Sequence, residues 1–223
     1  MSWRTVTVAS VALVAGVGCS AGTEGLVRKE GPEFELETRS WLSAIDRFGG
    51  DGMWLVMRTY HPGDDVIALA TNSDLSHAAV VDLSRGEVIE AVGQGVVITS
   101  LAKLVGETHR VRLIRPAGWT AERGAEAVAK ARSQVGHGYD FSGIVGMPDA
   151  DRFYCSELAA WSMGIRTDVK GVERVLHPKH LHEMGGTILF DSGPRDGMPD
   201  GVPEPVEGAA ESSAAPPEPP AAP

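Results

Sequence analysis

The sequence predicts an α+β fold in which a small antiparallel sheet packs against helices. A helical pattern comes first, short strand-like runs follow through the middle of the chain, and helical patterns return after residue 120. This order favours α+β over a parallel α/β sheet, in which strands and helices alternate. The 223 residues, 43% of them hydrophobic, are enough for one ordinary domain with extensions.

Four segments have the spacing or the capping residues of helices. In the first, Trp41, Leu42, Ile45 and Phe48 recur at helical spacing, and two glycines follow as a stop signal. Thr120 is a good N-cap for an Ala-rich helix that ends near a glycine. The predicted helices cover residues 38–48, 64–73, 121–134 and 153–163, the second of them after a turn at 61–63.

Five runs of strand-forming residues lie between turn signals. They cover residues 53–59, 77–82, 87–92, 96–100 and 110–115. Residues 83–86 fit a hairpin loop between the second and the third run. In that register Asp82 faces Glu87, and Ala79 faces Glu90.

The charge of the chain excludes one class of partner. Proteins that bind nucleic acids concentrate Lys and Arg to neutralise phosphates, whereas this chain has a formal net charge of −10. No nucleic-acid partner is therefore expected.

Residues 1–19 have the pattern of a secretory signal that ends in a lipobox. One charged residue, Arg4, precedes an apolar run that is shorter than the roughly 20 residues of a permanent membrane span. Cys19 follows a small residue, where a bacterial lipoprotein signal places its acylated cysteine, so lipidation and membrane anchoring at Cys19 are expected. Cleavage near Ala21 with release of a soluble protein is the alternative. Either route predicts an exported protein of the cell envelope or periplasm.

The folded domain is expected over residues 33–192, after a linker at 20–32. Residues 193–223 are rich in proline, alanine and acidic residues and contain no aromatic residue. Such a segment buries too little apolar surface to offset its ordering entropy, so a disordered tail is predicted.

Cys155 is the candidate nucleophile. The chain has 2 cysteines, and if Cys19 is lipidated or removed, Cys155 is left without a partner, which in an exported protein indicates a crosslink or a reactive site. The start of the helix predicted over 153–163 favours a thiolate, and its unpaired N–H groups can bind an oxyanion. A buried, inert cysteine fits the same pattern.

His77 and Glu90 are candidates for the base and for the acid that orients it. In the hairpin register above they lie on one sheet face as diagonal neighbours. Glu90 shares its face with Val88 and Val92, where an acid is costly unless it is paired. A one-residue slip would turn Glu90 to the opposite face, so a structural histidine and a solvated glutamate remain alternatives. Nucleophilic catalysis by a Cys needs such a base and such an orienting group.

Three histidines, His177, His180 and His182, lie close together near the end of the domain. Their spacing matches neither a helical i, i+4 pair nor a zinc-finger pattern, and no Cys or carboxylate joins them at the usual spacing. No metal and no cofactor are expected.

These residues resemble the YiiX/YaeF-like enzymes, which are circularly permuted members of the NlpC-type papain-like superfamily. The resemblance covers about residues 53–190. It rests on Ser76-His77 at the start of an apolar strand, a Glu in the next strand, Tyr139-Asp140-Phe141, and Tyr154-Cys155-Ser156-Glu157-Leu158. It departs from the family at Ala78-Ala79, where relatives often carry Gly or larger aliphatic residues.

The resemblance implies a circularly permuted papain-like fold with Cys155 as nucleophile, His77 as base and Glu90 as third residue. It also implies hydrolysis of an amide bond through a thioester, with peptidoglycan-type peptides or γ-glutamyl amides as substrates in the envelope. Two alternatives stay open. One is a lipid acyl hydrolase or acyltransferase that uses the same site, and the other is a non-catalytic envelope binding module.

Overall fold

The computed structural model describes residues 26–143, 147, 149, 151–165, 168–169, 172–173 and 175–195. The predicted signal with Cys19 and the predicted tail beyond residue 195 lie outside these residues. Within the described part of the chain, no helix is long and apolar enough to cross a membrane.

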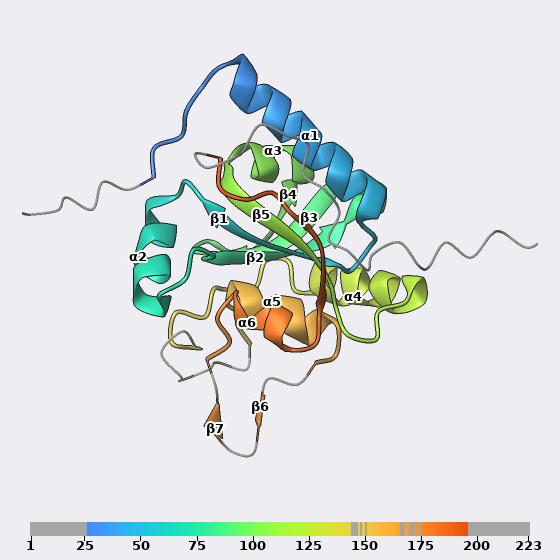
Figure 1. The fold of residues 1–223 in the computed structure, drawn as a ribbon. Helices are drawn as coiled ribbons and strands as arrows, with labels where there is room; N and C mark the ends of the chain where they lie inside the picture. Colours follow the sequence, from blue (N-terminus) through green and yellow to red (C-terminus); the bar gives the residue numbers. More distant parts are fainter. Residues whose placement is uncertain are drawn as a thin grey trace, which may run out of the picture.

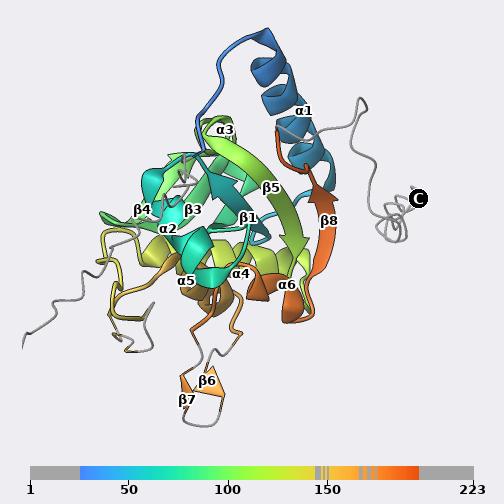
Figure 2. The same cartoon turned by 60° about the vertical axis from the view of Figure 1, so that its left-hand side comes forward.

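A six-stranded antiparallel sheet forms the centre of the domain (Figure 1). Its strand order is β4-β3-β2-β1-β5-β8, and Figure 2 shows β8 at the outer edge beside β5. The strands are β1 (Trp54–Thr59), β2 (His77–Asp82), β3 (Glu87–Val92), β4 (Gly95–Ser100), β5 (Thr108–Arg115) and β8 (Thr187–Asp191). A separate two-stranded ribbon joins β6 (Asp168–Val169) to β7 (Val172–Glu173).

Helices cover both faces of this sheet (Figure 1). The first face is covered by α1 and α3, and the second by α4, α5 and α6, while α2 lies at one end. The helices are α1 (Pro32–Phe48), α2 (Pro62–Thr71), α3 (Leu101–Gly106), α4 (Ala121–Ser133), α5 (Cys155–Ser162) and α6 (His180–Glu183), with a 3-10 turn at Leu83–Arg85. The predicted α+β architecture is confirmed.

Coverage of both faces explains the composition of the central strand β2. Its six residues, His77–Asp82, are all buried. Ala78 and Val80 pack with α4 and α5, while Ala79 and Val81 pack with α1 and α3. Because successive side chains point to opposite faces, a strand covered on both sides becomes a continuous buried run.

The structure corrects the sequence-based element bounds in several places. The first helix begins at Pro32, six residues before the predicted start, and α2 begins at Pro62, inside the predicted turn. Proline is well tolerated in the first turn of a helix, because its missing N–H has no partner there. The helix α5 begins at Cys155, since Phe153 instead forms a parallel bridge with Tyr139. The short helix α3 and the edge strand β8 were not predicted.

Arg195 fastens the end of the described chain to the first layer of helices. Its guanidinium lies 3.8 Å from the ring centroid of Phe34 and 3.9 Å from that of Trp41. It also donates to the backbone oxygen of Thr108 at 2.7 Å and pairs with Glu37 at 3.1 Å. Residues packed against the domain therefore continue to Arg195, three residues beyond the predicted boundary at 192.

Candidate active site

Cys155 is the first residue of α5, as the sequence-based placement near a helix start anticipated. The preceding residue, Tyr154, has an extended backbone, and its N–H donates to the Glu157 carboxylate at 3.4 Å. The Tyr154 hydroxyl accepts from the backbone N–H of Leu176 at 2.9 Å, which ties the helix start to a later segment. Buried contacts between α5 and β2 then hold the helix against the sheet.

This position favours a reactive thiol. Cys155 is a free cysteine with its side chain mostly buried. The N–H groups of the first helical turn have no acceptor within the helix, and the helix dipole places partial positive charge beside the sulfur. Such a position suits a nucleophilic sulfur, and the same N–H groups can bind an oxyanion.

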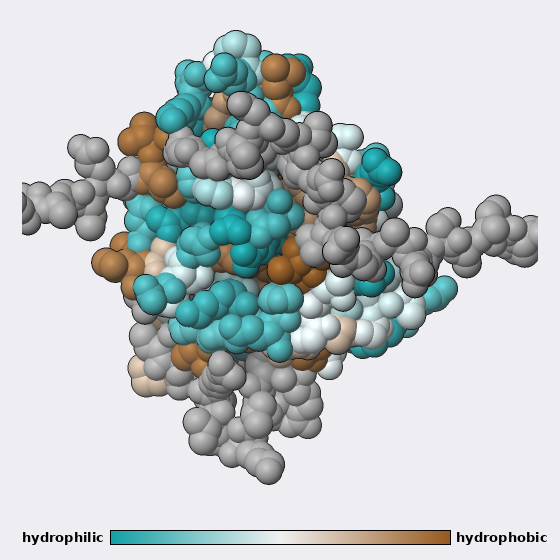
Figure 3. Space-filling model, in the orientation of Figure 1, coloured by the Kyte–Doolittle hydropathy of each residue, from teal (hydrophilic) through white to brown (hydrophobic). Residues whose placement is uncertain are grey.

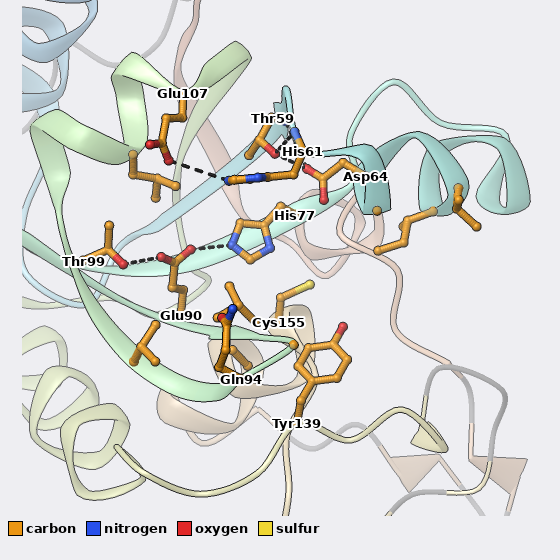
Figure 4. Close-up of a pocket in the computed structure, with 18 of the residues that line it drawn as sticks. Thr59, His61, Asp64, His77, Glu90, Gln94, Thr99, Glu107, Tyr139 and Cys155 are labelled. Atoms are coloured by element: carbon orange, nitrogen blue, oxygen red, sulfur yellow. Dashed lines mark hydrogen bonds and ion pairs between the residues drawn. The ribbon is translucent and has the colours of Figure 1, made fainter. Parts of the chain in front are cut away.

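His77 and Glu90 lie on neighbouring strands in the register that the sequence predicted. Ala79 pairs with Glu90 and Asp82 pairs with Glu87 across the hairpin. The His77 Nε2 atom lies 2.7 Å from the Glu90 Oε2 atom, and the Thr99 hydroxyl donates to the other carboxylate oxygen (Figure 4). Because Glu90 engages Nε2, the His77 ring presents Nδ1 on the side of Cys155 (Figure 4).

The surroundings of His77 keep its ring protonated. Burial lowers the pKa of His77, but hydrogen bonds and charge interactions with Cys155 and Glu90 outweigh burial and hold the pKa well above 6.5. Burial raises the pKa of Glu90, but the bond to His77 and then the bond to Thr99 lower it below its usual value. The arrangement therefore favours an imidazolium on His77 beside the Glu90 carboxylate.

These three residues line a cavity of about 790 Å³ (Figure 4). One wall comes from β3, β4 and α3, and the facing wall comes from α2 and the segment after α4. His61 and Glu107 form an ion pair at 3.6 Å on its rim. The cavity is large enough for a small-molecule or peptide ligand.

Among the lining residues to which sequence reasoning gave no catalytic role are Asp64, Gln94 and Tyr139. Asp64 stood out only as the first residue of the helix predicted over 64–73, and Tyr139 only through the resemblance of its motif. Gln94, in the turn between β3 and β4, carried no signal. Each reaches the cavity because strands and loops distant in sequence converge there, which no local pattern reveals.

Asp140 fixes the segment that carries Tyr139. Its fully buried carboxylate accepts from the N–H of Ser142 at 3.0 Å, of Gly143 at 2.8 Å and of Asp149 at 2.9 Å. These bonds, together with that from the Ser142 hydroxyl, outweigh burial and lower the pKa of Asp140. The cavity wall beside Cys155 is thus held by a charged group that stays ionised.

Residues 57–185 match the family of permuted papain-like amidases, the YaeF/YiiX or C92 family. The chain belongs to this family. Among solved structures, it is similar to the crystal structure of metalloprotein YiiX from Escherichia coli O157:H7. Their sequence identity is 23% and the TM-score is 0.52, over 62% of this chain and 95% of that chain. No curated protein matches the chain significantly.

Family membership confirms the resemblance that was inferred from the sequence. It also confirms the permuted papain-like fold that this resemblance implies. At the level of the family, the chain is a papain-like thiol hydrolase. The YiiX structure is titled a metalloprotein, whereas the described residues of this chain contain no group of three or more His, Cys, Asp or Glu side chains that could hold a metal ion. His177 and His180 contact each other at 5.1 Å between ring centroids, and neither of them lines the cavity.

Proposed function

We propose that this C92-family hydrolase cleaves an amide bond with Cys155 as nucleophile, His77 as base and acid, and Glu90 as orienting acid. The observation that carries the proposal is the continuous arrangement of Glu90, His77 and Cys155 along one wall of the cavity. A nucleophile, a base and a group that orients the base are the three parts of such a site.

Acylation begins with the Cys155 thiolate. Its sulfur attacks the amide carbonyl carbon, and the carbonyl π electrons move to the oxygen. When the tetrahedral intermediate collapses, the C–N bond breaks and the His77 imidazolium donates its Nδ1 proton to the leaving amine. The products of this step are a thioester on Cys155, a neutral His77 and a free amine.

Deacylation uses the same base on water. His77 accepts a proton from a water molecule, whose oxygen attacks the thioester carbonyl carbon. Collapse of this second intermediate releases a carboxylic acid and the Cys155 thiolate, and the imidazolium is restored. If another nucleophile replaces water, the same two steps transfer the acyl group.

The oxyanion of each intermediate needs hydrogen-bond donors. The backbone N–H of Cys155 supplies one, since the first turn of α5 has no acceptor for it. Tyr139 is the favoured second donor, because its hydroxyl lies toward Cys155 and makes no hydrogen bond with any residue that the structure describes (Figure 4). Burial and then the charge of Cys155 raise the pKa of Tyr139, which keeps the phenol protonated and able to donate.

The proposed substrates are envelope peptides of the peptidoglycan type or γ-glutamyl amides. An exported location with a lipid anchor on Cys19 is part of this proposal and rests on the signal pattern of residues 1–19. Incorporation of labelled palmitate into the expressed chain, and its loss in a Cys19→Ser variant, would support the anchor. Unchanged labelling in the Cys19→Ser variant would refute the proposed lipid anchor at Cys19.

A second candidate is a lipid acyl hydrolase or acyltransferase on the same site. It is favoured by apolar side chains at the cavity, where Val66 is 69% and Phe141 is 65% exposed. Figure 3 shows exposed apolar surface at the position of α2. Incubation with purified cell wall and with a lipid extract separates the two candidates, because each predicts consumption of a different material.

Alkylation of Cys155 by iodoacetamide across pH tests the proposed site. The full chain carries Cys19→Ser so that one thiol remains, with His77→Ala as the comparison. A thiol that reacts well below the free-cysteine pKa of about 8.5, and loses that reactivity without His77, is the expected result. An ordinary thiol that is indifferent to His77 would refute the activated pair.

A further inference from the structure

Asp64 is a buried acid to which the proposed mechanism gives no role. It lies in the first turn of α2 and is 9% exposed. Its Oδ2 atom accepts from the Thr59 N–H at 3.1 Å, the Thr59 hydroxyl at 2.6 Å and the Ser76 hydroxyl at 2.8 Å. One oxygen of this carboxylate is therefore fully used by the protein.

The other oxygen, Oδ1, is available to a ligand. It accepts no hydrogen bond from the residues that the structure describes, and it points into the cavity above Cys155 (Figure 4). Asp64 also has no ion-pair partner among these residues. By contrast, the other two acids that line the cavity are paired, Glu90 with His77 and Glu107 with His61.

Asp64 and Cys155 line the same cavity. Burial raises the pKa of Tyr139, and interactions with Cys155 and then Asp64 raise it further, so both residues act on the same phenol. Figure 4 places Asp64 and Tyr139 on opposite sides of the opening at Cys155. Lys103, a lysine that also lines the cavity, belongs to α3 and not to α2, which carries Asp64. The C-cap residue of α3 is Glu107. A ligand group held by Asp64 thus lies next to the bond that Cys155 attacks.

We propose that Asp64 is a specificity-determining residue that binds an ammonium group of the substrate beside the scissile carbonyl. The substrate class is then amides with a free amino group near the cleaved bond, such as peptides with an unblocked amino terminus. Burial removes water from the Asp64 carboxylate, and the protein supplies hydrogen bonds to only one of its two oxygens. An ammonium group that donates to the other oxygen, Oδ1, replaces the hydrogen bonds that water would have made. This inference rests on the proposed function, because it takes Cys155 as the nucleophile.

The test uses Cys155 as a reporter and needs no known substrate. The full chain with Cys19→Ser is treated with three methanethiosulfonates that carry a 2-aminoethyl, a methyl or a 2-sulfonatoethyl group. In each case the thiolate attacks the sulfenyl sulfur, a mixed disulfide forms and methanesulfinate leaves. The rate with each reagent is divided by its rate with free cysteine, so that only the preference of the site remains.

Asp64→Asn removes the charge and keeps the shape. The asparagine carbonyl oxygen can still accept from Thr59 and Ser76, while its amide group replaces the Oδ1 atom in the cavity. Glu107→Gln is the matched control, because it removes another cavity acid that already has a partner.

We expect the unsubstituted site to favour the aminoethyl over the sulfonatoethyl reagent by roughly tenfold or more, and Asp64→Asn to abolish most of this preference. Glu107→Gln should retain it. Charge-independent rates with a reactive Cys155 would overturn the role of Asp64 and leave the proposed function standing. If all three reagents fail to modify Cys155 faster than an ordinary thiol, the proposed function falls and this inference falls with it. An equal loss of reactivity toward all three reagents in Asp64→Asn would show that Asp64 only positions Ser76 and His77.

Discussion

Replacing Glu90 by Gln should weaken the activation of Cys155 without dismantling the site. The glutamine side chain can still accept from His77, but it carries no charge to stabilise the imidazolium. The bond in question is short, at 2.7 Å between Nε2 and Oε2, and both side chains are mostly buried, so solvent screens it little.

The size of the effect follows from this bond. A hydrogen bond to a charged group contributes about 1.5–3 kcal/mol, and about 1.4 kcal/mol corresponds to a factor of ten in an equilibrium constant. The equilibrium between thiol with imidazole and thiolate with imidazolium should therefore shift toward the neutral pair by roughly 10- to 100-fold.

The pH dependence should change with a defined sign. The pKa of His77 is raised, so the imidazolium that protonates the leaving amine persists above pH 6.5 and is lost only as the pH rises through the folded-state pKa. Without the charge of Glu90 this pKa falls, and the alkaline limb of the kcat/KM profile should move to lower pH.

Iodoacetamide alkylation at pH 6 in the Cys19→Ser background measures the effect directly. Glu87→Gln is the matched control. Glu87 is the first residue of the same strand, and it forms an ion pair with Arg132 and not with His77. Glu90→Gln should lower the alkylation rate by about tenfold or more, and Glu87→Gln should leave it unchanged. Equal rates in both variants would refute the assignment of Glu90 as the orienting acid.

Three further predictions test the surrounding structure. Tyr139→Phe should lower kcat about 100-fold with little change in KM, as loss of an oxyanion donor does, and unchanged kcat would exclude it as that donor. Arg195→Ala should lower the free energy of unfolding in urea by about 3–5 kcal/mol, because it leaves Glu37 and the buried backbone oxygen of Thr108 without their donor. A loss below about 1 kcal/mol would show that the contact contributes no more than a surface ion pair. Gly95→Ala should reduce activity and melting temperature, because a Cβ there lies 2.2 Å from the His137 oxygen at a φ of +114°. Gly93→Ala, with its nearest neighbour at 3.9 Å, should be tolerated and serves as the control.

The pairing of His77 with Glu90 could be predicted because both residues lie on one hairpin. Alternation fixes which face each residue occupies, and the loop length fixes the register. The same argument fails for Cys155. Its helix lies far along the chain, and no local pattern specifies which strand a helix packs against. The three residues were therefore joined only by the roles that nucleophilic catalysis requires and by the family resemblance.

The missed elements are short or depend on tertiary contacts. The helix α3 has six residues, too few for a clear periodic pattern, and β8 gains its hydrogen bonds only from β5. The position of Asp64 in the cavity could not be predicted from the sequence for the same reason. Its partners Thr59 and Ser76 come from separate segments, so its burial and its free oxygen appear only in the folded chain.

The order of the site residues along the chain has a consequence for biosynthesis. Because His77 and Glu90 precede Cys155, their hairpin leaves the ribosome before the nucleophile is made. The thiol is brought to its base by the packing of α5 against β2, and the edge strand β8 and Arg195 come later still in the sequence. A chain that ends before Cys155 therefore contains the base and the orienting acid but lacks the nucleophile, so the proposed site is complete only when α5 has been made.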